Sequence, residues 1–331
     1  MKQKPKMDQR RLGLMLAFGA LMWGGTYSAL AKGLTPFLSP VTLLILSEAL
    51  TAVFIIMTFG LAPLLKKLLE MDTRSLWFSA LIGILNSVIA PFLWFSGLAR
   101  TSAINASILS SMEIIFIIVL ARLFLRETLT RTQVVGAATV LFGVAIINLI
   151  PMDGTSAMHV GDLLILLGSF TYALGAILFK KHLSHVMPEL TIVIRNIVGI
   201  AAAFFISLFF HYSFLAEVKA FPLEKVALLV AFAFFSRYLN LTFFYEAIER
   251  LPATTLSLID IGNPLSGIIF AHLILGEQIA SYQIVGGIFI LCGLMIEQLS
   301  IPAALQHPLD FLKLRKRIMP IPVIHSIPRH V

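Results

Sequence analysis

Cysteine and charged residues are both scarce in this sequence. Of the 331 residues only Cys292 is a cysteine, so the chain forms no internal disulfide and offers no cysteine cluster to a metal ion. Only 13% of the residues are charged, whereas a soluble domain has about one in four. Hydrophobic residues make up 58% of the chain, more than one water-soluble core can hide. Lipid is therefore expected to cover much of this protein.

Motifs of several enzyme classes are also missing. The sequence has no G-x-x-x-x-G-K-[ST] loop for binding ATP, and no H-E-x-x-H or G-x-S-x-G arrangement. Its eight histidines are scattered, mostly in connecting segments and in the C-terminal tail. We therefore expect no metal centre, no cofactor and no enzymatic activity.

Apolar stretches long enough to cross a membrane are abundant instead. A helix needs roughly 20 apolar residues to cross the ~30 Å hydrocarbon layer, and helices satisfy their own backbone hydrogen bonds in lipid. Ten such stretches are found, at residues 12–32, 40–61, 76–98, 102–122, 132–150, 161–180, 190–211, 225–248, 253–275 and 280–299. The predicted fold class is an all-α integral membrane protein with ten transmembrane helices.

Basic residues are distributed unevenly between these stretches. With the N-terminus inside, the outside segments hold only Lys32, Arg100, Lys219 and Lys225, while the basic segment 1–11 and most other Lys and Arg lie inside. The positive-inside rule then predicts both termini in the cytoplasm, in an inner or plasma membrane. The net charge of +8 reflects this topology, so no nucleic-acid partner is expected.

The C-terminal segment 300–331 differs from the rest of the chain. Its five prolines break any long helix, and it is predicted to be a basic, proline-containing cytoplasmic tail. Two states are open for this tail. Either it is disordered, or residues 311–317 lie on the membrane surface with their basic side chains facing anionic lipid.

The chain repeats itself at an offset of about 150 residues. The matching positions are Leu125-x-Glu127 with Leu275-x-Glu277, Gln133 with Gln283, Gly136 with Gly286, and Gly143 with Gly293. Residues 12–150 and 161–299 are thus predicted to be two five-helix repeats, joined by the connecting loop 151–160. Because five is odd, the second repeat must be inverted relative to the first. Inverted repeats are typical of alternating-access transporters, and a duplicated scaffold or channel is the alternative.

At these residues the chain resembles the drug/metabolite transporter superfamily, specifically the EamA-type transporters. Their signature is L-x-E after the fourth span of each half, followed by glutamine and spaced glycines. Both halves contain it, and Trp23-Gly24 in the first span is also similar. The family usually has a proline in each fourth span, which Pro264 supplies in the second half while the first half has Ile114.

The resemblance implies efflux of small polar or amphipathic metabolites, such as amino acids, amines or drugs. Transport would be by alternating access, with protons as coupling ion or by facilitated exchange. The expected partners are the lipid bilayer and a small-molecule substrate. A lipid or prenyl-phosphate flippase, a membrane enzyme and a scaffold without transport stay open as alternatives.

Ionisable side chains are costly in lipid, so each one within an apolar stretch is a candidate site residue. Glu113 lies about 12 residues into its stretch, near the membrane midplane, on one helix face with Ala106 and Ser110. It is predicted to bind an amine or cationic group, or to carry the coupling proton. A permanent ion pair with Arg237 or Arg195 is the structural alternative.

The ninth stretch carries a second group of candidates. Asp260, Asn263 and Gly267 follow one stripe of this helix, beside Pro264. Since proline removes a backbone hydrogen bond, a bent, cavity-lining helix is predicted, with Asp260 and Asn263 as substrate-binding or coupling residues. Alternatively, Asp260 caps a local break or contacts a neighbouring hydroxyl.

Charged residues of other spans give two further predictions. Glu48 and Arg195 occupy nearly equivalent places in the two halves and are predicted to form a buried pair with a structural or gating role. Arg237, Tyr238 and Asn240 lie in the middle of the eighth stretch and are predicted to bind a substrate carboxylate.

Aromatic and amide residues complete the candidate site. The resemblance implies that spans one, three, four, six, eight and nine line the central cavity. This adds possible substrate contacts from Trp23, Tyr27, Asn86, Trp94 and Tyr172. For each aromatic residue, packing or a place in the interfacial belt is the alternative.

The repeated L-x-E and glycine positions are predicted to be structural. Glu127 and Glu277 are each expected to hold the start of the next helix, because a carboxylate is favourable at a helix N-terminus. The spaced glycines of each half mark one close-packed face per helix, which serves either helix packing or a homodimer interface.

Overall fold

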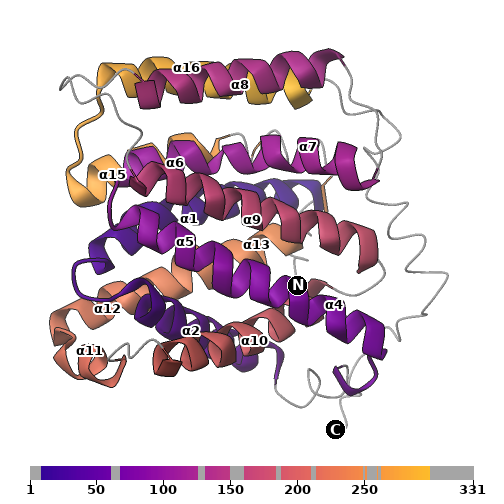
Figure 1. Cartoon of the computed structure of the whole chain (residues 1–331), viewed down its shortest axis with the longest axis vertical. Helices are drawn as coiled ribbons and strands as arrows, with labels where there is room; N and C mark the ends of the chain where they lie inside the picture. The colour runs from indigo at the N-terminus through magenta and orange to yellow at the C-terminus, as the bar shows by residue number, and fades with distance from the viewer. Residues whose placement is uncertain are drawn as a thin grey trace, which may run out of the picture.

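A computed structural model describes residues 9–60, 68–125, 131–149, 160–183, 188–209, 214–248, 250–251, 259 and 262–298. Regular structure in these ranges is helical throughout, and the helices run across the view in Figure 1. Helices of the first half are α1 (Gln9–Leu34), α2 (Pro40–Phe59), α4 (Thr73–Ile84), the π-helix η1 (Leu85–Ile89), α5 (Ala90–Leu98), α6 (Ala103–Ser110), α7 (Met112–Leu125) and α8 (Arg131–Leu149).

The second half repeats this order. Its helices are α9 (Val160–His182), α10 (Pro188–Phe209), the short α11 (Phe214–Ala220), α12 (Leu223–Ala231), the π-helix η2 (Phe232–Leu239), α13 (Asn240–Ile248), α15 (Asn263–Leu275) and α16 (Ser281–Gln298). Both π-helices interrupt the third span of their half. Such wide turns occur frequently at functional sites, and the sequence pattern did not predict them.

Local sequence signals explain where several helices begin and end. Ser39, Asp72 and Ser102 cap α2, α4 and α6, each accepting a hydrogen bond from a backbone N–H of the first turn. Pro40 occupies the first turn of α2, where its missing N–H costs nothing. Gly276 ends α15 with a φ of 69°, a left-handed conformation that favours glycine.

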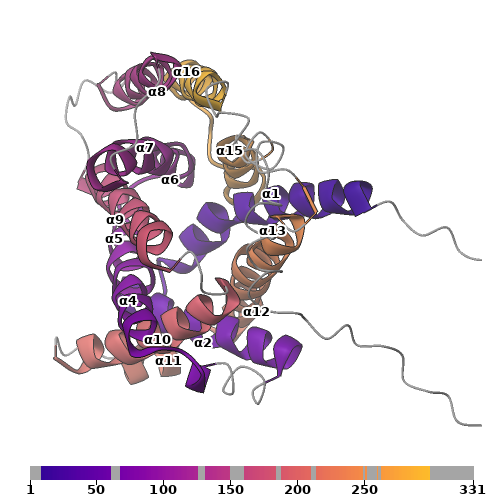
Figure 2. The same ribbon diagram turned by 90° about the vertical axis from the view of Figure 1, so that its right-hand side faces the viewer.

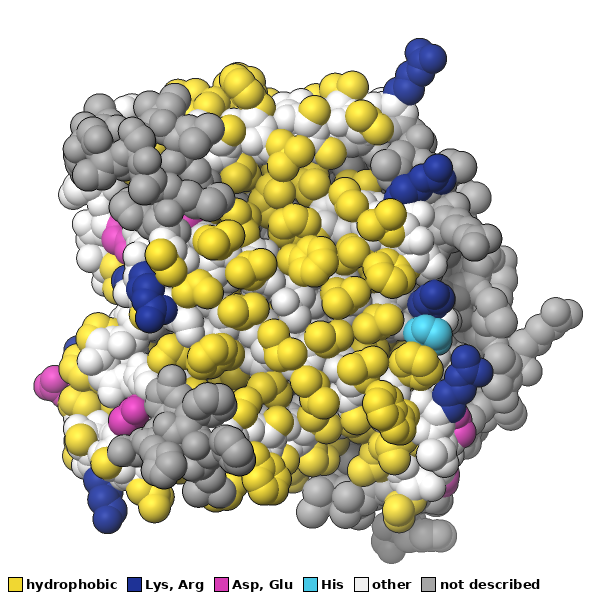
Figure 3. Space-filling view, viewed as in Figure 1, with side chains coloured by type: hydrophobic (Ala, Val, Ile, Leu, Met, Phe, Trp, Pro, Cys, Tyr) yellow, Lys and Arg dark blue, Asp and Glu magenta, His cyan; other side chains and the backbone are white. Residues whose placement is uncertain are grey.

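Within the described residues, six helical segments are long and apolar enough to cross a membrane. They are Arg11–Leu34, Pro40–Thr58, Thr73–Leu98, Ala103–Phe124, Val160–Phe179 and Leu223–Phe244. Four shorter apolar helices cover Val134–Ile147, Val193–Ile206, Asn263–Leu275 and Ser281–Ile296. Figure 3 shows apolar side chains across the middle of one face and Lys and Arg at its two edges. This pattern fits a multi-pass membrane protein, while the count of ten spans stays a prediction.

Helices of both halves share one core. Leu34, Leu43, Phe95, Ile104 and Phe232 are almost completely buried in a single cluster that joins the first four spans to the eighth. α1 packs against α13 and α15, and α5 packs against α9. The two halves therefore interlock through their first spans, and each half depends on the other for its burial.

The fifth helices of the two halves, α8 and α16, form a pair at one end of the molecule (Figures 1 and 2). A Cβ on Gly143 would lie 2.6 Å from the carbonyl oxygen of Gly286, and one on Gly293 would lie 2.6 Å from that of Gly136. Since the earlier glycine of each helix faces the later one of the other, α8 and α16 are antiparallel. The spaced glycines thus pack α8 and α16 together. Helix packing was one of the two roles predicted for them, beside a homodimer interface.

Candidate functional site

A cavity of about 380 Å³ lies among the central helices. Spans one, three, four, six, eight and nine contribute to it, and so does Leu294 of α16. Its polar lining residues are Tyr27, Ser28, Trp94, Ser107, Ser110, Ser111, Glu113, Ser169, Tyr172, Ser236, Asn240 and Asn263. The volume falls in the range of about 300–1,000 Å³ that is usual for small-molecule sites. Among these described lining residues, Glu113 is the one Asp, Glu, Lys, Arg or His.

Seven of the predicted substrate-binding or gating residues lie at this cavity. They are Tyr27, Trp94, Glu113, Tyr172, Asn240, Asn263 and Pro264. They come from the first, third and fourth spans of each half. Both repeats thus contribute predicted residues to the lining.

Other predicted residues lie elsewhere. Trp23 stacks on Phe235 with ring centroids 4.5 Å apart, and the Tyr238 hydroxyl is hydrogen-bonded to Thr58 of α2. Asn86 faces α9, where a Cβ on Gly175 would come within 2.0 Å of the Asn86 side-chain oxygen.

These three side chains do not line the cavity, because each is oriented toward a helix–helix contact. Two further candidates, Asp260 and Glu127, lie outside the described residues.

Both fourth spans are interrupted next to the cavity. In the first half a one-residue turn at Ser111 separates α6 from α7 within the span Ala103–Phe124, and Glu113 follows that turn. In the second half α15 begins at Asn263, with Pro264 in its first turn. Both breaks are thus close to residues that line the cavity.

Hydroxyl groups are the main feature of the cavity that the sequence did not indicate. Ser28, Ser107, Ser111, Ser169 and Ser236 all contribute to the lining. Only Ser110, on the same face as Glu113, was singled out, and it accepts a hydrogen bond from the Trp94 indole at 2.9 Å. The signal was present as serines within apolar stretches, but a lone serine bonds its own helix too easily to be diagnostic.

Two tyrosines stand at one side of the cavity. Tyr27 of α1 and Tyr172 of α9 both line it. Tyr27 is held by ring contacts to Trp94 and Phe232.

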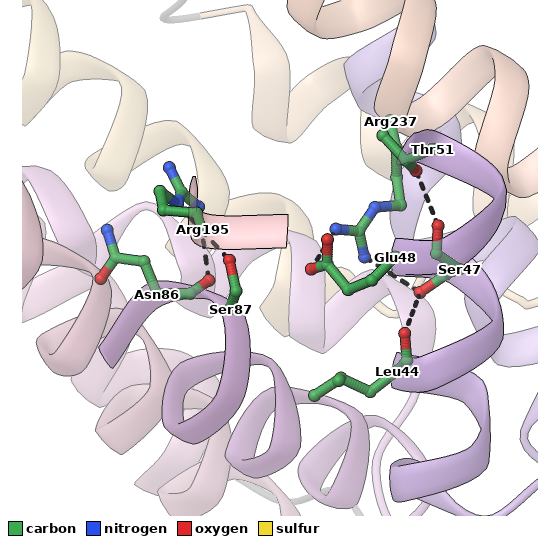
Figure 4. A network of polar contacts seen from close by, with 8 residues as sticks. All are labelled: Leu44, Ser47, Glu48, Thr51, Asn86, Ser87, Arg195 and Arg237. Carbon is green, nitrogen blue, oxygen red and sulfur yellow. Dashed lines mark hydrogen bonds and ion pairs between the residues drawn. The ribbon is translucent and has the colours of Figure 1, made fainter. Parts of the chain in front are cut away.

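The predicted pair between Glu48 and Arg195 is wrong. Glu48, which is 1% exposed, forms its ion pair with Arg237, and Arg237 also donates to Ser47 Oγ at 3.0 Å (Figure 4). Arg195 instead donates to the Asn86 carbonyl at 3.4 Å and to Ser87 Oγ at 3.5 Å. α2 packs against both α10 and η2, so these neighbours by themselves allow either arginine; the rotation of α2 directs Glu48 toward Arg237 of η2.

This geometry also corrects the prediction for Arg237. Its charge is neutralised by Glu48, so Arg237 is not available to a substrate carboxylate in this arrangement.

Glu277 holds a helix start, although not the one predicted. Its two carboxylate oxygens accept hydrogen bonds from the backbone N–H groups of Ala103 and Ile104, at 2.8 and 3.0 Å. The helix that it caps is α6 of the first half, and the predicted next helix, α16, begins without it. The L-x-E turn of one repeat thus fastens the fourth span of the other.

Further polar contacts gather at this end of the molecule. Lys32 Nζ donates to the carbonyl oxygens of Leu98 and Thr101, both at 2.6 Å, and Gln283 donates to Asn105 at 2.6 Å. These side chains border a second cavity of about 610 Å³. By the predicted topology this end of the molecule faces outward.

The substitution Glu277→Gln is expected to destabilise the start of α6, which Glu277 caps. Hydrogen bonds to a charged acceptor contribute about 1.5–3 kcal/mol, so amide hydrogens of residues 103–104 should exchange about tenfold faster or more. Hydrogen–deuterium exchange with peptide mass spectrometry measures this directly. Glu246→Gln, which alters a half-exposed pair with Arg250, is the control and should leave this segment unchanged. Equal exchange in Glu277→Gln and wild type would show that Glu277 does not fasten α6.

Two repeats of apolar helices around a polar cavity define the class of protein, which is a membrane transporter. A model of the EamA-like transporter family matches residues 11–149 and again residues 159–296, so the chain belongs to that family. The resemblance seen in the L-x-E, glutamine and glycine positions is thereby confirmed.

Curated relatives carry transporter names as well. The chain is 29% identical to an uncharacterized transporter of Methanothermobacter thermautotrophicus, over 65% of this chain and 62% of that protein. It is 24% identical to the uncharacterized transporter YyaM of Bacillus subtilis, over 87% and 94%. It is 25% identical to a probable amino-acid metabolite efflux pump of Escherichia coli, over 58% and 66%.

A solved structure shares the fold. It is described only as the crystal structure of a protein, and it superposes with a TM-score of 0.60 at 15% identity. The match covers 88% of this chain and 97% of the other, so the similarity extends over both repeats.

Proposed function

We propose that this protein exports a small polar or amphipathic metabolite by alternating access, through ten membrane spans with both termini in the cytoplasm of an inner or plasma membrane. One observation carries the proposal: a cavity of about 380 Å³, rich in hydroxyl and amide groups, lies where the two repeats meet. Such a cavity can replace the water around a polar solute at membrane depth. The name of the Escherichia coli relative supports an amino acid or a related metabolite as the substrate class.

The antiparallel repeats supply a way to open this cavity to either side. In the described state, Glu277 of the second repeat fastens the start of α6, and Lys32 fastens the end of α5 within the first repeat. Outward opening requires these contacts to break. The matching glutamate of the first repeat, Glu127, would fasten the opposite side in the other state.

We assign to Glu113 the role of binding the substrate amine or of carrying the coupling proton. It lines the cavity and lies near the middle of its span. A carboxylate at this depth either pairs with a cation from the substrate or takes up a proton as the surroundings change.

Metabolite profiling of medium and cytosol tests the proposal. Cells overproducing the wild type should accumulate one solute class outside, and cells overproducing Glu113→Gln at the same membrane level should lose about tenfold or more of that accumulation. If a proton is carried, the variant should also lose the pH dependence of transport. Glu246→Gln serves as the control at an exposed position. Unchanged export by Glu113→Gln would remove this residue from the site.

A further inference from the structure

Basic side chains and aromatic rings meet at one end of three neighbouring spans. Arg74 lies in the first turn of α4, Phe124 in the last turn of α7, and Lys181 and His182 in the last turn of α9. α9 packs against both α4 and α7. Figure 3 shows a histidine among Lys and Arg side chains at one edge of the face that these helices form. By the predicted topology this end of the molecule faces the cytoplasm.

Ring contacts connect these side chains across the helices. The His182 imidazole stacks on the Phe78 ring of α4, with centroids 3.9 Å apart and an angle of 7° between the planes. The Arg74 guanidinium lies over the same Phe78 ring, 6.0 Å from its centroid. Lys181 Nζ lies over the Phe124 ring of α7 at 5.9 Å. Since the face of a ring attracts a cation, these contacts hold Arg74, Lys181 and His182 together as one basic cluster.

The basic cluster lies at the depth of lipid headgroups. The apolar segment of α9 ends at Phe179, just before Lys181 and His182, and Arg74 stands at the start of the segment that begins at Thr73. The side chains of Arg74 and Lys181 are exposed, and that of His182 is half-buried. Basic side chains at the ends of spans reach toward the interface, so the basic cluster is expected to face the phosphate groups of the bilayer.

Carboxylates leave this positive charge uncompensated in the part of the chain that the structure describes. Arg74 and Lys181 form no ion pair there. Asp72, the nearest acid along the chain to Arg74, accepts a hydrogen bond from the Ser75 backbone N–H at 3.0 Å and caps α4. The pKa of His182 is lowered by burial and by the charges of Lys181 and Arg74. An anion placed among these like charges would relieve their repulsion.

We propose that the basic cluster binds the phosphate of an anionic phospholipid in the leaflet on this side of the membrane. Arginine and lysine donate charge-assisted hydrogen bonds to phosphate oxygens, and the histidine ring adds a further donor. Because Arg74 belongs to the first half and Lys181 and His182 to the second, a bound headgroup links the two repeats at this end.

A lipid suits this place better than a soluble phosphate does. Apolar side chains adjoin the basic cluster on two helices, where Trp77 of α4 is 68% exposed and Leu123 of α7 is 66% exposed. Acyl chains can cover these side chains while the headgroup meets the basic cluster. The site is separate from the central cavity, since Arg74, Lys181 and His182 are not among the residues that line it.

Native mass spectrometry of the full-length protein in detergent tests the proposal. Phosphatidylglycerol and phosphatidylcholine with identical acyl chains are added in turn, and the dissociation constant of the first bound lipid is measured. Wild type should bind the anionic lipid about tenfold or more tightly than the neutral one. Arg74→Gln combined with Lys181→Gln should abolish this preference. Arg74→Lys combined with Lys181→Arg keeps both charges and should retain most of it.

Two single substitutions serve as controls. Lys225 Nζ lies 5.5 Å from the Phe37 centroid, a contact of the same kind at the end that is predicted to face outward. Arg131 begins α8, on the predicted cytoplasmic side but apart from α4 and α9 in Figures 1 and 2. Lys225→Gln and Arg131→Gln should each keep the preference for the anionic lipid.

Thermal unfolding separates a lipid from a soluble anion. Phosphatidylglycerol should raise the melting temperature of the wild type, because it links the repeats, and inorganic phosphate at the same concentration should not. Equal stabilisation by inorganic phosphate would show that the occupant is a soluble phosphate and would overturn the proposal.

Three results of the lipid-binding measurement would also overturn it. Equal affinity of the wild type for the two lipids would show that no anionic headgroup is recognised. A preference that is unchanged in the double glutamine variant would place the headgroup elsewhere. A loss in Arg131→Gln as large as in that variant would show a general attraction to surface charge and no defined site.

Discussion

Glu48→Gln is expected to destabilise the protein by about 3–5 kcal/mol, the usual cost of leaving one partner of a buried ion pair alone. Glu48 is 1% exposed and Arg237 side-chain atoms are 14% exposed, so water cannot replace the lost carboxylate. Ser47 Oγ, at 3.0 Å, would remain as a hydrogen-bond acceptor for the guanidinium and carries no charge. Thermal unfolding of the purified protein in detergent measures the effect as a lower melting temperature.

Replacing both partners should be far milder than replacing one. Glu48→Met combined with Arg237→Met removes both charges and keeps side chains of similar length, and such exchanges are often neutral or stabilising. Glu48 Oε2 has no hydrogen-bond partner among the described residues, which adds to the cost of keeping the pair. If the single and double variants melted at the same temperature, the two residues would not act as a pair. Glu246→Gln is the control, because Glu246 forms a more exposed pair with Arg250. Loss of such an i,i+4 pair usually lowers the stability by only about 0.3–0.5 kcal/mol.

Gly25→Ala is expected to disrupt the packing of α1 on α15. An added Cβ would lie 1.6 Å from Ser266 Oγ and 2.8 Å from the Ser266 backbone carbonyl carbon, so the two helices would have to separate. Overpacking of this kind costs typically about 1–3 kcal/mol, and here the contact includes backbone atoms that cannot turn aside. The variant should melt lower than wild type, and transport should fall as well because Gly25 lines the central cavity.

Gly287→Ala provides the matched control for this substitution. No heavy atom lies within 4 Å of an added Cβ on Gly287, and alanine favours a helix by about 1 kcal/mol over glycine. Its melting temperature should equal or slightly exceed that of wild type. Ser266→Gly in the Gly25→Ala background removes the nearest side-chain atoms and should restore part of the loss. Equal melting of the Gly25 and Gly287 variants would mean that α1 and α15 do not approach as closely as described.

Comparison of Glu277 with Glu48 shows how far sequence reasoning reaches. That Glu277 would stabilise a helix start followed from its charge and its place in a turn, and the structure bears this out. Which helix it caps did not follow, because the partner lies 174 positions away in the other repeat. Glu48 does form a buried ion pair, but the predicted partner was wrong. The sequence places two arginines, Arg195 and Arg237, at membrane depth, and either was compatible with it.

By itself the sequence determined the class of protein, the twofold repetition and the close-packed glycine faces. These depend on composition, on the length of apolar stretches and on periodic spacing, all of which are local properties. The tertiary structure alone decided that Arg237 and not Arg195 receives Glu48, that serines converge on one cavity, and that Trp23, Asn86 and Tyr238 point away from it. The physical reason is that a side chain's neighbours across a helix interface depend on how each helix is rotated and crossed by another, which spacing along the chain does not specify.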